Sequence, residues 1–150
     1  MGELRVEVSV GAGVEAPVST DAVERAVVET LRAEGVDDAE ISVALLSDEE
    51  MARLNEEYLG HEGTTDSISF ALHEAGEPPL GDVYVGVEQA VRQAEGFGAT
   101  AAEEVLRVAI HSTLHVLGWD HPDGEERLES EMFRRQEAIL ERVRGGAAGG

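Results

Sequence analysis

The sequence predicts an α+β fold in which a small mixed sheet of about four strands packs with about five helices. Apolar residues alternate with polar ones at the start of the chain, and they recur at helical spacing in several later segments. The chain has 150 residues, of which 42% are hydrophobic, so one core of ordinary size can form. Neither a repeat nor a second domain is visible. We expect a single domain over residues 1–144 and a flexible Gly/Ala tail over 145–150.

The first half of the chain predicts two strand–helix units. Residues 4–10 alternate between apolar and polar types, as in a strand with one buried face. Ser19 or Thr20 can then cap a helix that ends at Gly35. Residues 41–46 form a second strand, and the capping box at 47–50 begins a helix that extends to about residue 58.

The second half predicts a hairpin followed by three helices. Strands at 65–72 and 82–87 are joined by a Gly- and Pro-containing connection, so they should pair antiparallel. A short helix follows at 88–95, and a capping box at 100–103 begins a helix from about 101 to 117. The last helix, from about 125 to 144, should carry along one face Leu128, Met132, Arg135, Ile139 and Val143.

The predicted helix at 101–117 carries the start of a dense histidine run, HSTLHVLGWDH. His111 and His115 lie four residues apart, so their imidazoles share one helix face. Gly118 can end the helix and allow the chain to bring His121 back to the same point. Three neutral nitrogens leave one position of a tetrahedral zinc ion open to water, as in catalytic sites. Three imidazoles also accept nickel, copper or cobalt. Because the chain has no cysteine, a metal must bind to nitrogen and oxygen atoms.

The spacing of this run is also that of the metzincin peptidases, whose signature begins His-Glu. Here the second residue is Ser112, whose hydroxyl cannot serve as a carboxylate base near neutral pH. The sequence therefore argues against a zincin-like peptidase.

Composition gives weaker indications. The formal net charge is −21, which opposes binding to a nucleic acid. All eleven cations are arginine, however, and such a composition can reflect the proteome rather than the partner. No apolar run approaches the roughly 20 residues of a membrane span, and the first residues do not resemble a signal peptide, so we expect a cytoplasmic protein with no membrane partner.

The histidine run resembles the H-G-x-L-H-L-x-G-Y-D-H signature of the YbeY family of bacterial zinc endoribonucleases. Three other segments resemble family motifs in the same order: Leu54-Asn55 with Tyr58, residues 65–70 (TDSISF), and residues 80–83 (LGDV). The resemblance implies a zinc ion held by His111, His115 and His121. It also implies single-strand-specific cleavage of RNA in 16S rRNA 3′-end maturation and ribosome quality control. The partners implied are the small-subunit rRNA precursor, the small ribosomal subunit and an Era-type GTPase.

One departure from the family concerns catalysis. Leu59 stands where many members carry an arginine after the tyrosine, and leucine cannot neutralise a phosphoryl oxygen. Arg107, one turn before His111, is our candidate substitute. The alternative is a surface arginine paired with Glu103 or Glu104.

The remaining candidates have two interpretations each. Asp66 could accept a hydrogen bond from a metal-binding histidine or cap the turn that follows it, and Asp120 could do the same within the histidine run. His61 and His73 are expected to be solvated, although His61 could line the cleft. Trp119 fits core packing better than stacking on an RNA base.

Two other functions stay open at this point. One is a ribosome-associated rRNA maturation factor in which the zinc is mainly structural, which Leu59 and the acidic surface favour. The other is a zinc hydrolase of small phosphoesters, which would share the metal site.

Overall fold

The computed structural model describes residues 2–59, 66–119 and 126–148. Its centre is a four-stranded sheet in the order β1-β2-β4-β3. β1 (Leu4–Val10), β2 (Ala39–Leu46) and β4 (Leu80–Gly86) are parallel, and β3 (Ser67–Ala71) pairs antiparallel with β4. The mixed sheet and the antiparallel hairpin predicted from the sequence are thus confirmed.

Five α-helices pack around the sheet within the described ranges, as the sequence predicts. They are α1 (Thr20–Ala33), α2 (Asp48–Leu54), α3 (Val87–Phe97), α4 (Ala101–Val116) and α5 (Glu126–Ala148). Ser19, Ser47 and Thr100 each cap a helix by accepting a hydrogen bond from the backbone N–H three residues on. A single π-helical turn, Asn55–Leu59, continues α2 to the end of the predicted helix.

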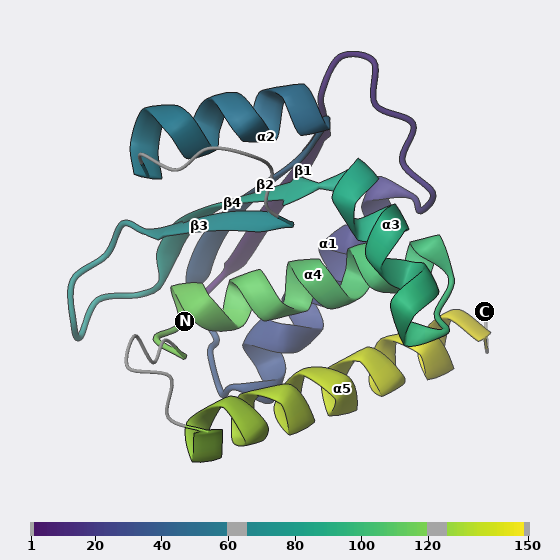
Figure 1. Cartoon of the computed structure of the whole chain (residues 1–150). Coiled ribbons are helices and arrows are strands. Elements are labelled where there is room, and N and C mark those ends of the chain that lie inside the picture. Colours follow the sequence, from purple (N-terminus) through teal and green to yellow (C-terminus); the bar gives the residue numbers. More distant parts are fainter. Residues whose placement is uncertain (1, 60–65, 120–125, 149–150) are drawn as a thin grey trace.

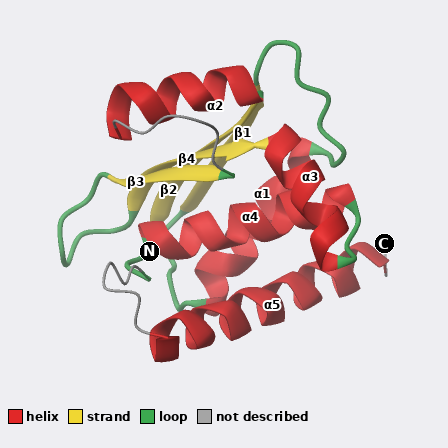
Figure 2. Ribbon diagram, in the orientation of Figure 1, coloured by secondary structure: helices red, strands yellow, loops and turns green. Residues whose placement is uncertain are grey.

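The two faces of the sheet differ (Figures 1 and 2). α1, α3, α4 and α5 lie on one side of it and α2 on the other. On β2, alternate residues Ile41, Val43 and Leu45 are buried toward the four helices, while Glu40 and Ser42 are exposed on the opposite face. The main core therefore lies between the sheet and the four helices, and α4 is its most buried helix.

The face of α5 that packs on the core differs from the expected one. The sequence placed Arg135 on the apolar stripe, but its side chain is 46% exposed, and Gln136 is buried instead. The helix also continues to Ala148, beyond the expected end at residue 144. Each glycine costs about 1 kcal/mol in a helix, but adding residues to a formed helix avoids the cost of nucleation.

Within the described ranges, none of the helices combines the length and apolarity needed to cross a lipid bilayer.

Candidate metal site

Helix α4 positions the two described histidines of the run. Thr100 fixes its first turn, and its last turn ends at Gly118, whose φ of 104° excludes most other residues. The N–H of Gly118 donates to the carbonyl of His115, and that of Trp119 to the carbonyl of Leu114. This pair of bonds is a Schellman motif, so the sequence correctly places the helix stop at the glycine.

The last turn of α4 lies unusually close to the sheet. A Cβ atom at Gly81, on β4, would lie 2.6 Å from Cγ1 of Val116 and 2.8 Å from the carbonyl oxygen of Phe70. Only a glycine leaves room for this approach. The glycine of the LGDV segment therefore determines how closely the end of α4, next to His115, can pack on β4.

His111 and His115 converge on one face of α4. Their Nε2 atoms are 2.9 Å apart, and their rings meet edge to face with centroids separated by 4.5 Å. Both side chains are half-buried. The helical spacing thus brings the two nitrogens together, as predicted, while their binding of a common ion stays a prediction.

A residue of α5 completes the hydrogen bonding of His111. The Nδ1 atom of His111 lies 2.7 Å from Oε1 of Gln136, which is only 5% exposed. The amide nitrogen of Gln136 donates to Oε2 of Glu137 at 3.1 Å. The position of His111 is therefore determined by the backbone of α4 and by the buried side-chain amide of Gln136 on α5.

Arg107 is engaged by two carboxylates. Its Nε and Nη2 donate to the two oxygens of Glu137 at 2.8 and 3.0 Å, and its Nη1 donates to Glu104 at 2.8 Å. The side chain of Arg107 is 12% exposed and that of Glu104 only 1%. Hydrogen bonding to Glu137 raises the pKa of the Arg107 guanidinium. Burial alone would raise the pKa of Glu137, but hydrogen bonds from Arg107 and Gln136 outweigh it and lower that pKa.

This network differs from both interpretations of Arg107 that the sequence allowed. Arg107 does pair with Glu104, as the alternative interpretation holds, but it is not a surface residue and its second partner comes from α5. A role for Arg107 as substitute cation for the residue at position 59 stays a prediction. Each guanidinium nitrogen already donates to a carboxylate, which argues against it.

Several predicted site residues lie outside the described parts of the chain. These are His121, Asp120, His61 and the side chain of Leu59, whose backbone ends the π-helical turn. Among the residues the structure describes, no three His, Cys, Asp or Glu side chains gather around one point. The third ligand of the predicted site stays a prediction.

The other candidates have contacts of their own. The Asp66 carboxylate accepts a hydrogen bond from Gln93 of α3 at 3.3 Å. The His73 Nδ1 accepts from the backbone N–H of Leu80 at 3.1 Å, which ties the two ends of the β3–β4 connection. The indole of Trp119 packs against the core and donates to Glu34 at 2.7 Å.

Ser112 is fully buried, and within the described structure its hydroxyl has no hydrogen-bond partner. It follows His111 directly, so it points to a different face of the helix. It cannot replace the missing glutamate of a peptidase.

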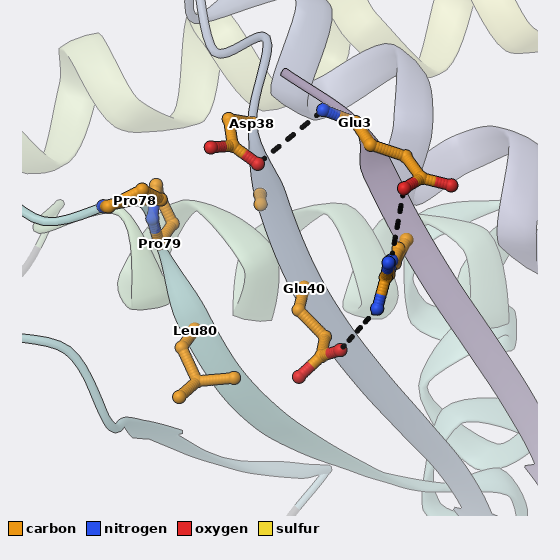
Figure 3. A pocket seen from close by; sticks show the side chains of 8 residues that line it. Glu3, Asp38, Glu40, Pro78, Pro79 and Leu80 are labelled. Atoms are coloured by element: carbon orange, nitrogen blue, oxygen red, sulfur yellow. Dashed lines mark hydrogen bonds and ion pairs between the residues drawn. The ribbon is translucent and has the colours of Figure 1, made fainter. Parts of the chain in front are cut away.

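A hollow of about 390 Å³ lies on the face of the sheet that is turned away from α4 and its histidines (Figure 3). Arg5, Glu40 and Leu80 alternate with the residues that face α4, so this hollow is separated from the histidines by the sheet. Glu3, Asp38 and Glu40 make it acidic, and its Arg5 already pairs with Glu3 at 3.2 Å. A polyanion would be repelled there.

Sequence reasoning missed Gln136 and Glu137. The signal was present, since Met132, Gln136, Ile139 and Val143 follow helical spacing and Gln136 is the one polar residue among them. A glutamine on an apolar stripe needs a buried partner, and here that partner is His111.

Comparisons with known proteins agree with this architecture. The family described as Endoribonuclease YbeY matches residues 13–144. The chain is 43% identical to the endoribonuclease YbeY of Bacillus licheniformis over 121 residues, which covers 73% of this chain and 75% of that protein. It is 37% identical to that of Roseiflexus castenholzii over 147 residues, with 92% of each chain covered. A protein of Thermotoga maritima with a solution structure shares the fold at a TM-score of 0.67 and 28% identity, with 97% and 92% of the two chains covered. The chain belongs to the YbeY endoribonuclease family.

Proposed function

We propose that the protein is a zinc-dependent endoribonuclease that cleaves single-stranded RNA, with the metal held by His111, His115 and His121. Its substrate is the small-subunit rRNA precursor, in 16S rRNA 3′-end maturation and ribosome quality control. It acts in the cytoplasm with the small ribosomal subunit and an Era-type GTPase. The observation that carries the proposal is the convergence of two Nε2 atoms 2.9 Å apart in a member of this family.

The donor set fits a zinc ion. Tetrahedral zinc with Zn–N bonds of about 2.0–2.1 Å needs two ligand nitrogens about 3.3 Å apart. The observed separation is slightly shorter, and a small rotation of either half-buried side chain can increase it. His111 already has a partner at Nδ1, which leaves Nε2 as its metal-binding atom.

The chemistry follows from this donor set. Zinc bound there would supply Lewis acidity, which activates water and polarises a phosphoryl oxygen. The residues of the chain hold the two imidazoles in place: α4 sets their spacing, Gly81 and Gly118 fix the end of the helix, and Gln136 orients the ring of His111. Ser112 offers no base, so peptide hydrolysis by the zincin route is not supported.

The decisive experiment is cleavage of a defined single-stranded RNA from the 3′ end of the 16S precursor. Zinc-loaded wild type should cut it and leave the same sequence in a duplex intact. His115→Ala should lose zinc and at least about 100-fold of the cleavage rate, because removal of one of three ligands leaves a site that does not retain the metal. His73→Ala is the matched control, since His73 lies in the β3–β4 connection.

The same preparations separate the alternatives. If His115→Ala, purified identically, cuts as fast as wild type, the cleavage comes from a copurifying nuclease. If wild type binds zinc, loses stability with a chelator and does not cut, the zinc is structural and the protein is a maturation factor. Leu59→Arg should raise the rate if the residue at position 59 limits catalysis.

A further inference from the structure

We propose that Gln136 is the positioning residue of the metal site: its amide oxygen holds His111 in the Nδ1–H tautomer, so that Nε2 presents its lone pair to the metal. The inference rests on the proposed function, because it concerns the same site. It adds a residue that acts on the site through its hydrogen bond to His111.

The direction of each hydrogen bond follows from Glu137, the last acceptor in the series of hydrogen bonds from His111 through Gln136. An ionised carboxylate can only accept, so the side of the Gln136 amide that faces Glu137 must be the NH₂ group. Its carbonyl oxygen then faces His111, and a carbonyl oxygen can only accept. The proton of the short contact between the two residues therefore lies on Nδ1 of His111.

The chain of hydrogen bonds is anchored at its far end. Arg107 binds both oxygens of Glu137 in a bidentate fork, and Glu104 binds the remaining side of the guanidinium. Glu137 cannot turn away without leaving Arg107 less compensated in a nearly buried position. Because Glu137 is fixed, the Gln136 amide cannot flip, and His111 cannot exchange one tautomer for the other.

The same logic places the proton between the two histidines. With Nε2 of His111 unprotonated, the 2.9 Å contact requires Nε2–H on His115 as the donor. Metal binding through both Nε2 atoms then requires the proton of His115 to move from Nε2 to Nδ1, whereas His111 already carries its proton at Nδ1. Gln136 thus prepares one of the two ligands before the metal arrives.

Two measurements test the inference. In metal-free, ¹⁵N-labelled protein, the long-range ¹⁵N–¹H spectrum should show His111 protonated at Nδ1 in wild type, and both tautomers in Gln136→Met, which keeps the side-chain length and loses the acceptor. Competition with a chromogenic chelator should show zinc binding about 10–100-fold weaker in Gln136→Met.

The controls separate positioning from stability. Ile139→Val loosens the buried face of α5 one turn further on without touching the amide, and it should leave both the tautomer and the zinc affinity unchanged. If Gln136→Met keeps the wild-type tautomer and affinity while His115→Ala loses zinc, the inference is wrong and the metal site stands. Equal loss of zinc in Ile139→Val also refutes it. If wild type binds zinc no better than His115→Ala, the proposed site fails, and the inference with it.

Discussion

Replacement of Gly81 by alanine tests how closely α4, which carries His111 and His115, packs on the sheet. The added Cβ would meet Cγ1 and Cγ2 of Val116 at 2.6 and 3.0 Å and the carbonyl oxygen of Phe70 at 2.8 Å. Carbon atoms pack best at about 3.5–4.0 Å, so the closest contact is short by about 1 Å. Since one of the obstructing atoms belongs to the backbone, rotation of a side chain cannot relieve the whole clash.

The expected loss of stability can be worked out from these contacts. Overpacking of this kind costs about 1–3 kcal/mol, and the backbone contact places Gly81→Ala in the upper half of that range. Reduced entropy of the unfolded chain returns about 0.4–1 kcal/mol. The net destabilisation should be about 2 kcal/mol, which lowers Tm by roughly 4–8 °C for a domain of this size. Urea unfolding followed by far-UV circular dichroism measures the first quantity and a thermal scan the second.

A second substitution shows whether Val116 is the obstacle. Val116→Ala alone should cost about 2 kcal/mol, because it removes two buried methyl groups. In the double variant the new methyl of residue 81 occupies part of the space that Val116 leaves. The double variant should therefore be more stable than the sum of the single effects by about 1 kcal/mol or more. Additive effects, or a Gly81→Ala protein as stable as wild type, would refute the account of this close approach.

Three further predictions follow from buried and charged groups. Ser112→Ala should stabilise the protein by about 1 kcal/mol in urea unfolding, because it removes a buried hydroxyl that lacks a partner and adds a better helix former; a loss of stability would show that the hydroxyl is satisfied. Glu137→Gln should destabilise the protein at pH 7 and lose this effect in acid: the folded-state pKa of Glu137 is lowered, so its contribution is present above the unfolded value of about 4.3 and disappears as the pH falls through the folded value. A difference that grows as the pH is lowered from 7 would contradict this sign. RNA binding should depend weakly on salt, with a slope of log K against log salt no steeper than about −3, since ion pairs engage seven of the eleven arginines within the described structure; a slope near −6 would show many more phosphate contacts.

The local part of the structure was predictable because its signals are local. Capping residues, the period-two strands and the glycine stop of α4 each act within a few residues, and each predicted feature is present in the structure. The convergence of His111 and His115 is of the same kind, because i and i+4 spacing on a helix suffices to produce it.

The errors on α5 have a different origin. Two stripes were compatible with its sequence, one through Arg135 and one through Gln136, and an arginine stem can cover apolar surface. Tertiary contacts decide between them. Arg135 lies over the ring of Trp119 at 4.8 Å and pairs with Glu34, at the end of α1, while Gln136 meets His111. All three partners, Trp119, Glu34 and His111, lie outside α5, so no pattern within α5 could have identified them.

Arg107 shows the same limit and has a consequence for catalysis. Sequence spacing suggested partners on its own helix, yet its bidentate partner, Glu137, is 30 residues away. The group of Glu104, Arg107 and Glu137 carries one more negative than positive charge, so it offers no net cation to a phosphate. If Arg107 moved to bind a phosphoryl oxygen, Glu104, which is 1% exposed, would lose its ion-pair partner. Loss of one partner of a buried ion pair costs about 3–5 kcal/mol. With Arg107 held in this way, the positive charge for cleavage would come from a bound metal or from cations elsewhere in the chain, and Arg107 would serve the proposed site by holding Glu137 and, through Gln136, His111.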